Sequence, residues 1–547
     1  MDTGRVFRWG GRVGLATVWV VIAGLTPVGA AVSEQKGPAP GEEYGRSHTQ
    51  NLTADHSKFE VLKADFQSAP EVTRACLSCH TEAARQLQKT IHWTWLCPAD
   101  SRKELGKAGL VVNNFCISIH ANEPRCTSCH VGYGWKDKTF DFTAEERVDC
   151  LICHEQTGSY KKFPTKAGFP VSEPTLFKGN GKMYEPPDYP RVAQSVGRPT
   201  RRNCGVCHFF GGGGEGVKHG DLDASIFKPN KALDVHMNID GENFNCTRCH
   251  TTEKHAISGR CYKTPATEDR RTLLDSDLIK RITCYSCHTE TPHDPGVKAN
   301  DHTDKVACQT CHIPRFARVN STKMNWDWST AGKKDENGKP MAKKEDGRPV
   351  YDTKKGDFRW EKNVVPEYRW YNGVIKNVLL TEKIDPGRRV ELNYPVGGYD
   401  DPNARIYPFK MHQGKQPYDK VHKTMVAPKL FGPKGSGSYW SGYDWKTAIE
   451  KGMEYVGLPF SGEYDFVETA YFFQTTHMVA PEKDALSCTE CHARDNGRIA
   501  NLAGFYMPGR DRHPLLDIAG WGGTVIALIV VFFHGVGRMV TRRNRRG

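Results

Sequence analysis

Two apolar runs lie near the two ends of this 547-residue chain, and the long stretch between them is mostly polar. The first run, Val13–Leu25, follows three arginines and precedes Pro27 and the small residues Gly29, Ala30 and Ala31. A basic start, a short apolar centre and a small-residue exit are typical of a secretory signal. We therefore expect residues 1–31 to be a signal peptide that is removed on export.

The second run, Ile518–Val536, is long enough to cross a bilayer as one helix. It is followed by five arginines: Arg538, Arg542, Arg543, Arg545 and Arg546. Because positive flanks stay cytoplasmic, the body of the chain is expected on the other side. Residues 511–547 are thus predicted to form a transmembrane anchor with a basic tail, which holds a periplasmic body at a bacterial inner membrane. A buried core helix is the alternative, and the terminal position disfavours it.

Between these runs the pattern predicts short elements. Ala83–Thr90 fits a short helix, and the aromatic spacing of Trp445–Tyr455 and Tyr464–Met478 favours two more. The segment Lys333–Lys355, rich in Lys, Gly and Asp, is expected to be a solvent-exposed loop or hairpin.

One five-residue motif, Cys-x-x-Cys-His, occurs eight times and is numbered here 1 to 8 along the chain. This spacing is the attachment signature of c-type haem, in which two thiols bind one porphyrin and the adjacent His binds its iron. Because His follows the second Cys in every copy, a zinc site or a disulfide is disfavoured. The copies are Cys76, Cys79 and His80; Cys126, Cys129 and His130; Cys150, Cys153 and His154; Cys204, Cys207 and His208; Cys246, Cys249 and His250; Cys284, Cys287 and His288; Cys308, Cys311 and His312; and Cys488, Cys491 and His492.

Eight covalently bound haem c groups would fill much of the interior, so the chain need not supply a large aliphatic core. We expect a multihaem cytochrome c fold that is mainly α-helical and irregular, with a haem-filled core, little β-structure and one C-terminal transmembrane helix. The expected parts after the signal peptide are a seven-haem part (32–312), a Cys-poor region with the eighth haem (313–510) and the anchor (511–547).

Composition adds two constraints. Three of the 19 cysteines lie outside the motifs, Cys97, Cys116 and Cys261, and this odd remainder suggests a free thiol or an intermolecular bond. The net charge of +13 comes largely from the two ends, and no nucleic-acid-binding motif accompanies it. We expect no nucleic-acid partner.

The motifs use eight of the 22 histidines, and fourteen remain to supply the opposite ligands of the irons. We expect the distal ligands to be His92, His219, His236, His255, His302, His412 and His477. Each of these could instead be a surface or hydrogen-bonded histidine.

Motif 2 is the expected substrate site. From Val131 to Cys207 the only histidine is His154, which belongs to motif 3, so a haem covered by this segment has no local imidazole for its far side. The same segment supplies several cations, which suit an anionic substrate. Beside His130, the expected catalytic residues are Lys161, Lys162, Arg191 and, as a proton relay, Asp188. His120, six residues before the motif, could close this iron instead.

Several stretches resemble the octahaem tetrathionate reductase family, related to pentahaem nitrite reductase and hydroxylamine oxidoreductase. They include Val111–Cys116, Asn122–Arg125, Gly132–Trp135, Asn203–Asp221, Asp234–Met237 and His477–Pro481. The resemblance covers about residues 50–507. It implies seven haems with two His ligands and one active haem, on motif 2, with a lysine near its iron. The chain differs from the family by its C-terminal helix and by Arg191 at the place we assign to that lysine.

Three functions remain open at this stage. A reductase would act on tetrathionate, nitrite or hydroxylamine at a haem without a second strong ligand. A pure electron conduit would have every iron six-coordinate, and a hydroxylamine-oxidising enzyme would run in the opposite direction. The expected partners are a small anionic or N–O/S–O substrate, the membrane, and a quinol-oxidising subunit or a periplasmic electron carrier.

Overall fold

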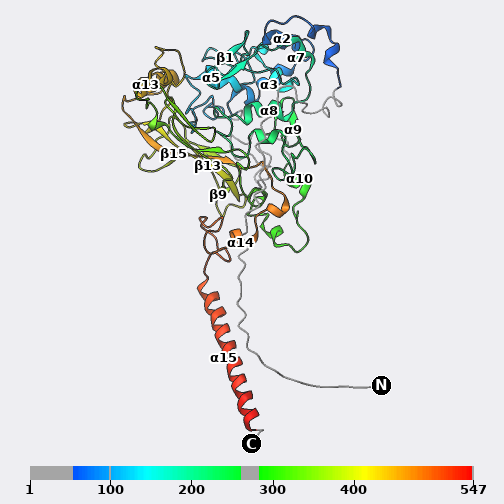
Figure 1. The fold of residues 1–547 in the computed structure, drawn as a ribbon, viewed down its shortest axis with the longest axis vertical. Coiled ribbons are helices and arrows are strands. Elements are labelled where there is room, and N and C mark those ends of the chain that lie inside the picture. The colour runs from blue at the N-terminus through cyan, green and yellow to red at the C-terminus, as the bar shows by residue number, and fades with distance from the viewer. Residues whose placement is uncertain (1–52, 98–99, 260–282, 545–547) are drawn as a thin grey trace, which may run out of the picture.

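The computed structural model describes residues 53–97, 100–259 and 283–544. The predicted signal peptide, Cys261 and the last two arginines lie outside these residues. The described chain forms a broad body from which one long C-terminal helix projects (Figure 1).

Short helices and loops make up the part of the body that carries motifs 1 to 7. This agrees with the expected irregular structure, and the predicted helix at Ala83–Thr90 is confirmed as α3. The α-helices of this part are α2 (Ala69–Leu77), α3 (Ala83–Gln88), α4 (Ile91–Thr94), α5 (Glu123–Cys126), α6 (Leu151–His154), α7 (Tyr189–Gln194), α8 (Arg201–His208), α9 (Cys246–Cys249), α10 (Tyr285–His288) and α11 (Cys308–His312). Its small hairpins are β1–β2 (Thr175–Phe177, Lys182–Tyr184) and β3–β4 (Thr252–Glu253, Ala256–Ile257).

The expectation of little β-structure is wrong, because a nine-stranded sheet occupies residues 322–474. Its main order is β11-β15-β13-β5-β8-β7-β6, and β9 and β14 also pair with β13. The strands are β5 (Thr322–Asp327), β6 (Ala342–Glu345), β7 (Arg348–Asp352), β8 (Gly356–Glu361), β9 (Glu367–Tyr371), β11 (Val390–Glu391), β13 (Arg405–Asp419), β14 (Thr424–Met425) and β15 (Tyr464–Gln474), and β10 (Ile375–Asn377) pairs separately with β12 (Asn393–Pro395).

The segment predicted as a helix at Tyr464–Met478 is instead the strand β15. It pairs antiparallel with β13 over eleven residues, from Tyr464 opposite Asp419 to Gln474 opposite Phe409. Aromatic and β-branched residues dominate β15, and such residues pack well on a pleated surface. Tertiary pairing with a long neighbour thus overrides the helical spacing.

Two other predictions in this region are confirmed. Helix α13 spans Trp445–Val456, and it packs so closely that a Cβ on Gly452 would lie 1.7 Å from the Ala427 carbonyl oxygen. The lysine-rich segment contains the β6–β7 hairpin, whose turn residues Asp346 and Gly347 have φ of 47° and 75°. Positive φ at both central residues is typical of a type I′ turn.

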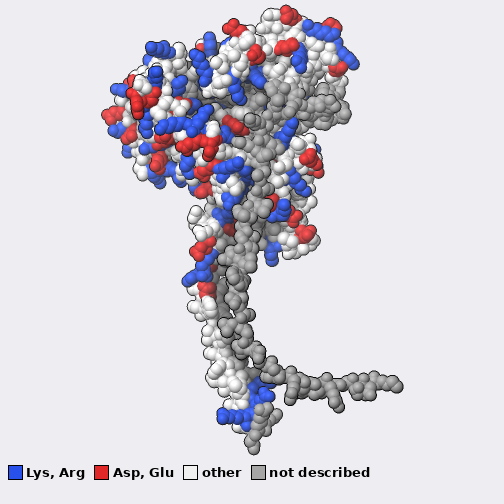
Figure 2. Space-filling model, viewed as in Figure 1, with Lys and Arg blue, Asp and Glu red and all other residues white. Residues whose placement is uncertain are grey.

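Helix α15, Pro514–Asn544, is the single helix of the described chain with the length and hydropathy to cross a membrane, and none of its apolar window is buried. Figure 2 shows a nearly uncharged surface along it, with basic residues gathered at its far end. The body ends in α14 (Cys488–Cys491), a short distance above α15 (Figure 1).

Candidate functional site

Each Cys-x-x-Cys-His motif lies on or directly beside a short helical segment. Motif 2, for example, spans the end of α5 and the 3₁₀ turn Thr127–Cys129, and motif 4 ends α8. Residues three and four apart share a helix face, so this fold directs both thiols and the histidine of a motif to the same side. None of the sixteen motif cysteines is in a disulfide, so all are available to bind porphyrin.

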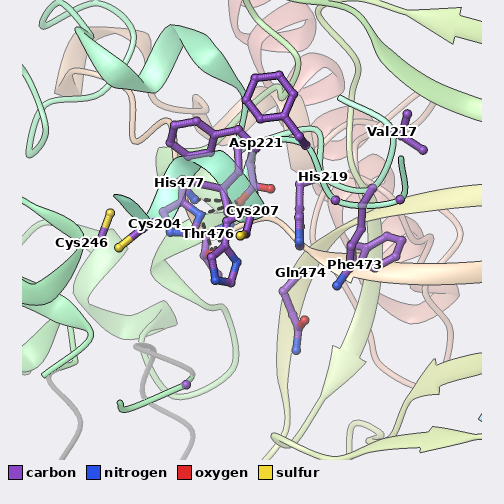
Figure 3. Close-up of a pocket in the computed structure, with 18 of the residues that line it drawn as sticks. Cys204, Cys207, Val217, His219, Asp221, Cys246, Phe473, Gln474, Thr476 and His477 are labelled. Carbon is purple, nitrogen blue, oxygen red and sulfur yellow. Dashed lines mark hydrogen bonds and ion pairs between the residues drawn. The ribbon is translucent and has the colours of Figure 1, made fainter. Parts of the chain in front are cut away.

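These faces open onto one very large internal cavity of about 3820 Å³, and residues of motifs 2 to 8 line it. Protein interiors are close-packed, so a cavity of this size requires prosthetic groups to fill it. Figure 3 shows a part of it where Cys204, Cys207 and Cys246 face the void beside His219 and His477.

Seven motif histidines face a second histidine ring. The ring-centroid distances are 6.2 Å for His80–His56, 6.5 Å for His154–His255, 6.2 Å for His208–His92, 6.3 Å for His250–His477, 5.9 Å for His288–His236, 6.1 Å for His312–His293 and 6.0 Å for His492–His302. A metal–imidazole bond is about 2 Å long. Two rings that share one metal therefore have centroids roughly 6 Å apart, so the spacing of all seven pairs fits an iron between them.

Hydrogen bonds prepare many of these rings for a metal. Nδ1 of His154, His250 and His492 lies 2.7–2.9 Å from a backbone carbonyl, and Nδ1 of His477 lies 3.0 Å from Asp221 Oδ2. An Nδ1–H that donates in this way leaves Nε2 with its lone pair free to bind iron. The donor set therefore fits haem with two axial histidines.

The placement of the expected distal residues is mixed. His92, His236, His255, His302 and His477 each face a motif histidine. His219 and His412 do not: the His219 ring packs on Phe473 at 5.4 Å, and the His412 ring packs on Phe115 at 5.1 Å.

Two histidines that the sequence analysis did not name as distal ligands complete the seven pairs. His56 faces His80, and His293 faces His312. His56 precedes motif 1 by twenty residues in a polar lead-in, and no local signal marks it. His293 lies five residues after His288 yet faces His312 of the next motif. Nearness in sequence could not choose between His293 and His302.

His130 of motif 2 is the exception among the motif histidines of the described chain, because no second histidine ring faces it. Five aromatic rings surround it at 5.0–6.5 Å, those of Trp93, Trp95, Trp135, Phe140 and Phe142. The side chain is 1% exposed, and burial lowers its pKa to about 3, so it is neutral. Its Nε2 lies 2.6 Å from the Trp93 carbonyl oxygen, and its buried Nδ1 has no hydrogen-bond partner.

His120 does not close this site. Its Nε2 lies 2.7 Å from the Gly109 carbonyl oxygen, and no ring contact joins it to His130 among the described residues.

Lys162, one of the two expected catalytic lysines, is held in place by contacts with the backbone of the motif 2 loop and with Asp149. Its Nζ donates to the carbonyl oxygens of His130 and Gly132 at 2.5 and 3.1 Å, and it forms a 2.9 Å ion pair with Asp149. The side chains of Lys162 and Asp149 are 5% and 0% exposed. Asp149 also accepts from the hydroxyls of Tyr133 and Tyr160. This network holds the motif 2 loop in place.

Of the other expected catalytic residues, one lines the cavity and two do not. Lys161 is exposed and lines the cavity, together with Lys178 and Lys182 of the β1–β2 hairpin. Asp188 and Arg191 are exposed on α7 and do not line it: Asp188 caps the helix by accepting from the Arg191 backbone N–H at 3.0 Å. The structure therefore does not bring these two residues to the cavity wall with Lys161.

Comparison with known proteins gives three matches. A family model for bacterial cytochrome c matches residues 323–495. An uncharacterized protein of Archaeoglobus fulgidus is 23% identical over 277 residues, which cover 44% of this chain and 89% of that protein. The chain is 44% identical to the octahaem cytochrome c from Shewanella oneidensis, whose crystal structure matches it with a TM-score of 0.69. The match covers 81% of this chain and 94% of the Shewanella chain.

With eight attachment motifs, paired histidines at iron-binding spacing and this relative, the chain belongs to the multihaem c-type cytochromes, which carry covalently bound haem c.

Proposed function

We propose that this protein is a membrane-anchored octahaem reductase whose body lies in the periplasm and whose substrate site is at motif 2. The candidate substrates are small oxidants with S–O or N–O bonds, namely tetrathionate, nitrite and hydroxylamine. The placement of α15 across the membrane is part of this proposal.

The unpaired state of His130 is the observation that carries the proposal. A haem held by two histidines conducts electrons, and a haem with only one strong protein ligand can also bind substrate. Seven motifs have the paired geometry, so they suit conduction. A pure electron conduit would need no motif histidine without a partner ring, and His130 of motif 2 is such a histidine.

Positive charge gathers around the same motif. Lys107, Arg125 and Lys162 lie close enough to the Cys129 thiol to lower its pKa, with the Cys207 thiol as the larger cause. Lys355 and Arg125 lie similarly close to the neighbouring Cys116. Cations aimed at a cavity attract an anionic oxidant and stabilise the negative charge that develops as it is reduced.

Lys161 is a further cation at this cavity, and its side chain is exposed. It is exposed at the cavity wall, so its ammonium can meet an incoming anion, whereas Lys162 is fixed by its ion pair. We assign anion capture to Lys161 and the positioning of His130 to Lys162.

The test is turnover of the purified full-length protein with tetrathionate, nitrite and hydroxylamine, with a reduced viologen as the donor. Lys161→Gln should raise KM for an anionic substrate roughly fivefold, since one partly screened charge contributes about 1 kcal/mol. It should leave KM for neutral hydroxylamine unchanged. The matched control is Lys446→Gln, an exposed lysine on α13 that does not line the cavity.

A second measurement locates the site. Crystals soaked with nitrite should show it on the motif 2 haem. Nitrite on another haem, His120 bound to this iron, or no turnover of any of the three substrates would contradict the proposal and favour an electron conduit.

A further inference from the structure

We infer that electrons enter this protein at motif 8, from a quinol-oxidising protein of the membrane, and pass along a line of adjoining motifs to motif 2. The inference rests on the proposed haem attachment and membrane insertion of α15, and not on the identity of the substrate.

The chain holds motif 8 close to α15. Nδ1 of His492 lies 2.7 Å from the carbonyl oxygen of Pro508, and Gly509 approaches so closely that a Cβ there would lie 2.6 Å from the His492 carbonyl oxygen. Helix α15 begins at Pro514. Six residue steps span at most about 22 Å, so motif 8 cannot lie far from the membrane surface.

The connection is folded rather than extended. Arg510 donates to the carbonyl oxygens of Leu502 and Phe505 at 2.5 and 2.7 Å, and Asp511 accepts from the backbone N–H of Met507 at 2.7 Å. These bonds tie the start of the anchor to the loop that also holds His492. The body is therefore fixed to α15 at this end.

From motif 8 the thiols of successive motifs lie next to one another. Each thioether would stand on the rim of its porphyrin, so neighbouring thiols bring two rims close together. Five pairs of cysteine sulfurs lie close to one another along the line to the substrate site. They are Cys311–Cys491, Cys284–Cys308, Cys249–Cys287, Cys204–Cys246 and Cys129–Cys207.

These pairs join the motifs in the order 8, 7, 6, 5, 4 and 2. In the last step, Cys207 Sγ also lies 3.8 Å from the Cys129 carbonyl oxygen. Motifs 3 and 1 form a side arm, in which Cys153 lies near Cys207 and Cys76 lies near Cys150. Motif 2 is thus the end of one branch and motif 1 the end of the other.

Motifs 1 and 8 both reach the surface, and their positions relative to α15 distinguish them. Cys79 of motif 1 and Cys488 of motif 8 are both exposed. Figure 1 places α2, which carries motif 1, at the far end of the body from α15, whereas α14 lies beside the anchor. A donor held in the membrane meets motif 8 first.

The donor must be a separate protein, because a single transmembrane helix offers no enclosed pocket for a quinol. Each quinol that is oxidised to a quinone releases two protons and two electrons. The electrons reduce two ferric irons to ferrous irons, one each, and the protons remain with the donor side.

The experiment follows haem reduction by stopped-flow absorbance in native membranes that hold the full-length protein, with menadiol as the quinol and without any substrate. His302→Met replaces the ring that faces His492. A thioether ligand raises the potential of a haem, so electrons should be held at motif 8 and reduction of the remaining haems should slow at least tenfold. The matched control, His56→Met, changes motif 1 at the far end and should leave the rate unchanged.

Two further measurements make the outcome decisive. Dithionite reaches every exposed haem and should reduce both variants at the wild-type rate. Three EAAAK repeats inserted between Asp511 and Arg512 should lift motif 8 by about 22 Å and abolish reduction by quinol while dithionite still acts. A wild-type rate in His302→Met or in the insertion variant, a slower rate in His56→Met, or a wild-type protein that quinol does not reduce would overturn the inference. No substrate is present, so the proposed reductase activity can fail without affecting this result.

Discussion

The pairing of histidine rings predicts how many haems per chain accept an external ligand. Seven motif histidines face a second ring, and His130 does not. An iron held by two histidines has no free position, whereas a motif 2 iron held by His130 alone would have one. The reduced protein should therefore bind about one carbon monoxide molecule per chain, and about one eighth of its ferric haem should be high-spin.

The sharpest perturbation of this count is His56→Ala. It removes the ring that lies 6.2 Å from that of His80, and neither ring lines the cavity that residues of motif 2 line. Motif 1 should lose its sixth ligand, so carbon monoxide binding should rise to about two per chain and high-spin ferric haem to about one quarter. Titration of the reduced protein, followed by absorbance, measures the first, and electron paramagnetic resonance measures the second.

The control is His422→Ala, since Nδ1 of His422 lies 3.1 Å from Asp419 Oδ2, away from every motif histidine in the described chain. That variant should keep the wild-type stoichiometry. A wild-type protein that binds no carbon monoxide would refute the reasoning, because every iron, motif 2 included, would then be closed. An unchanged count in His56→Ala would remove His56 as a ligand.

Three further predictions concern stability and the anchor. Burial, together with the charge of Glu215, raises the pKa of Asp223 from 3.8 to about 6, so lowering the pH from 8 to 5 should stabilise the folded protein by about 1.4 kcal/mol through this group. Asp223→Asn should remove that dependence in thermal unfolding compared at the two pH values; an equal dependence in the variant would contradict it. Asp149→Ala removes the carboxylate partner of the buried Lys162 ammonium and should lower the free energy of unfolding by about 3–5 kcal/mol in thermal denaturation. Glu454→Ala, in the exposed pair with Lys451, should leave it almost unchanged, and similar losses in the two variants would count against a buried pair. Removal of all residues after Gly509 should give a soluble protein that works with a viologen donor but not with membrane quinol, and equal quinol-driven rates would end that idea.

The eight attachment motifs could be found from the sequence because covalent chemistry fixes their spacing. The thiols and the proximal histidine of one haem must lie within five residues, so the signal is entirely local. The unusual position of motif 2 was also visible, as a long segment with only His154 in it. Its structural basis, the lack of a ring opposite His130, agrees with that interpretation.

The distal histidines were only partly predictable because each pair joins segments set by the tertiary fold. His92 faces His208, and His477 faces His250, across separations that no local pattern records. The sheet was missed for a related reason. β13 and β15 owe their conformation to each other, and the aromatic residues of Tyr464–Gln474 fit either period until the partner strand is known.

The pair formed by His250 and His477 has a consequence for how the protein is made. On the proposed route of export, the chain emerges from its N-terminus, so motif 5 appears long before the residue that completes its ligand set. Until His477 has emerged, the haem of motif 5 has only one protein ligand, and another nearby imidazole can bind its iron. Correct maturation therefore depends on the order of emergence, and a pause in translocation before residue 477 should favour molecules with a wrong axial ligand.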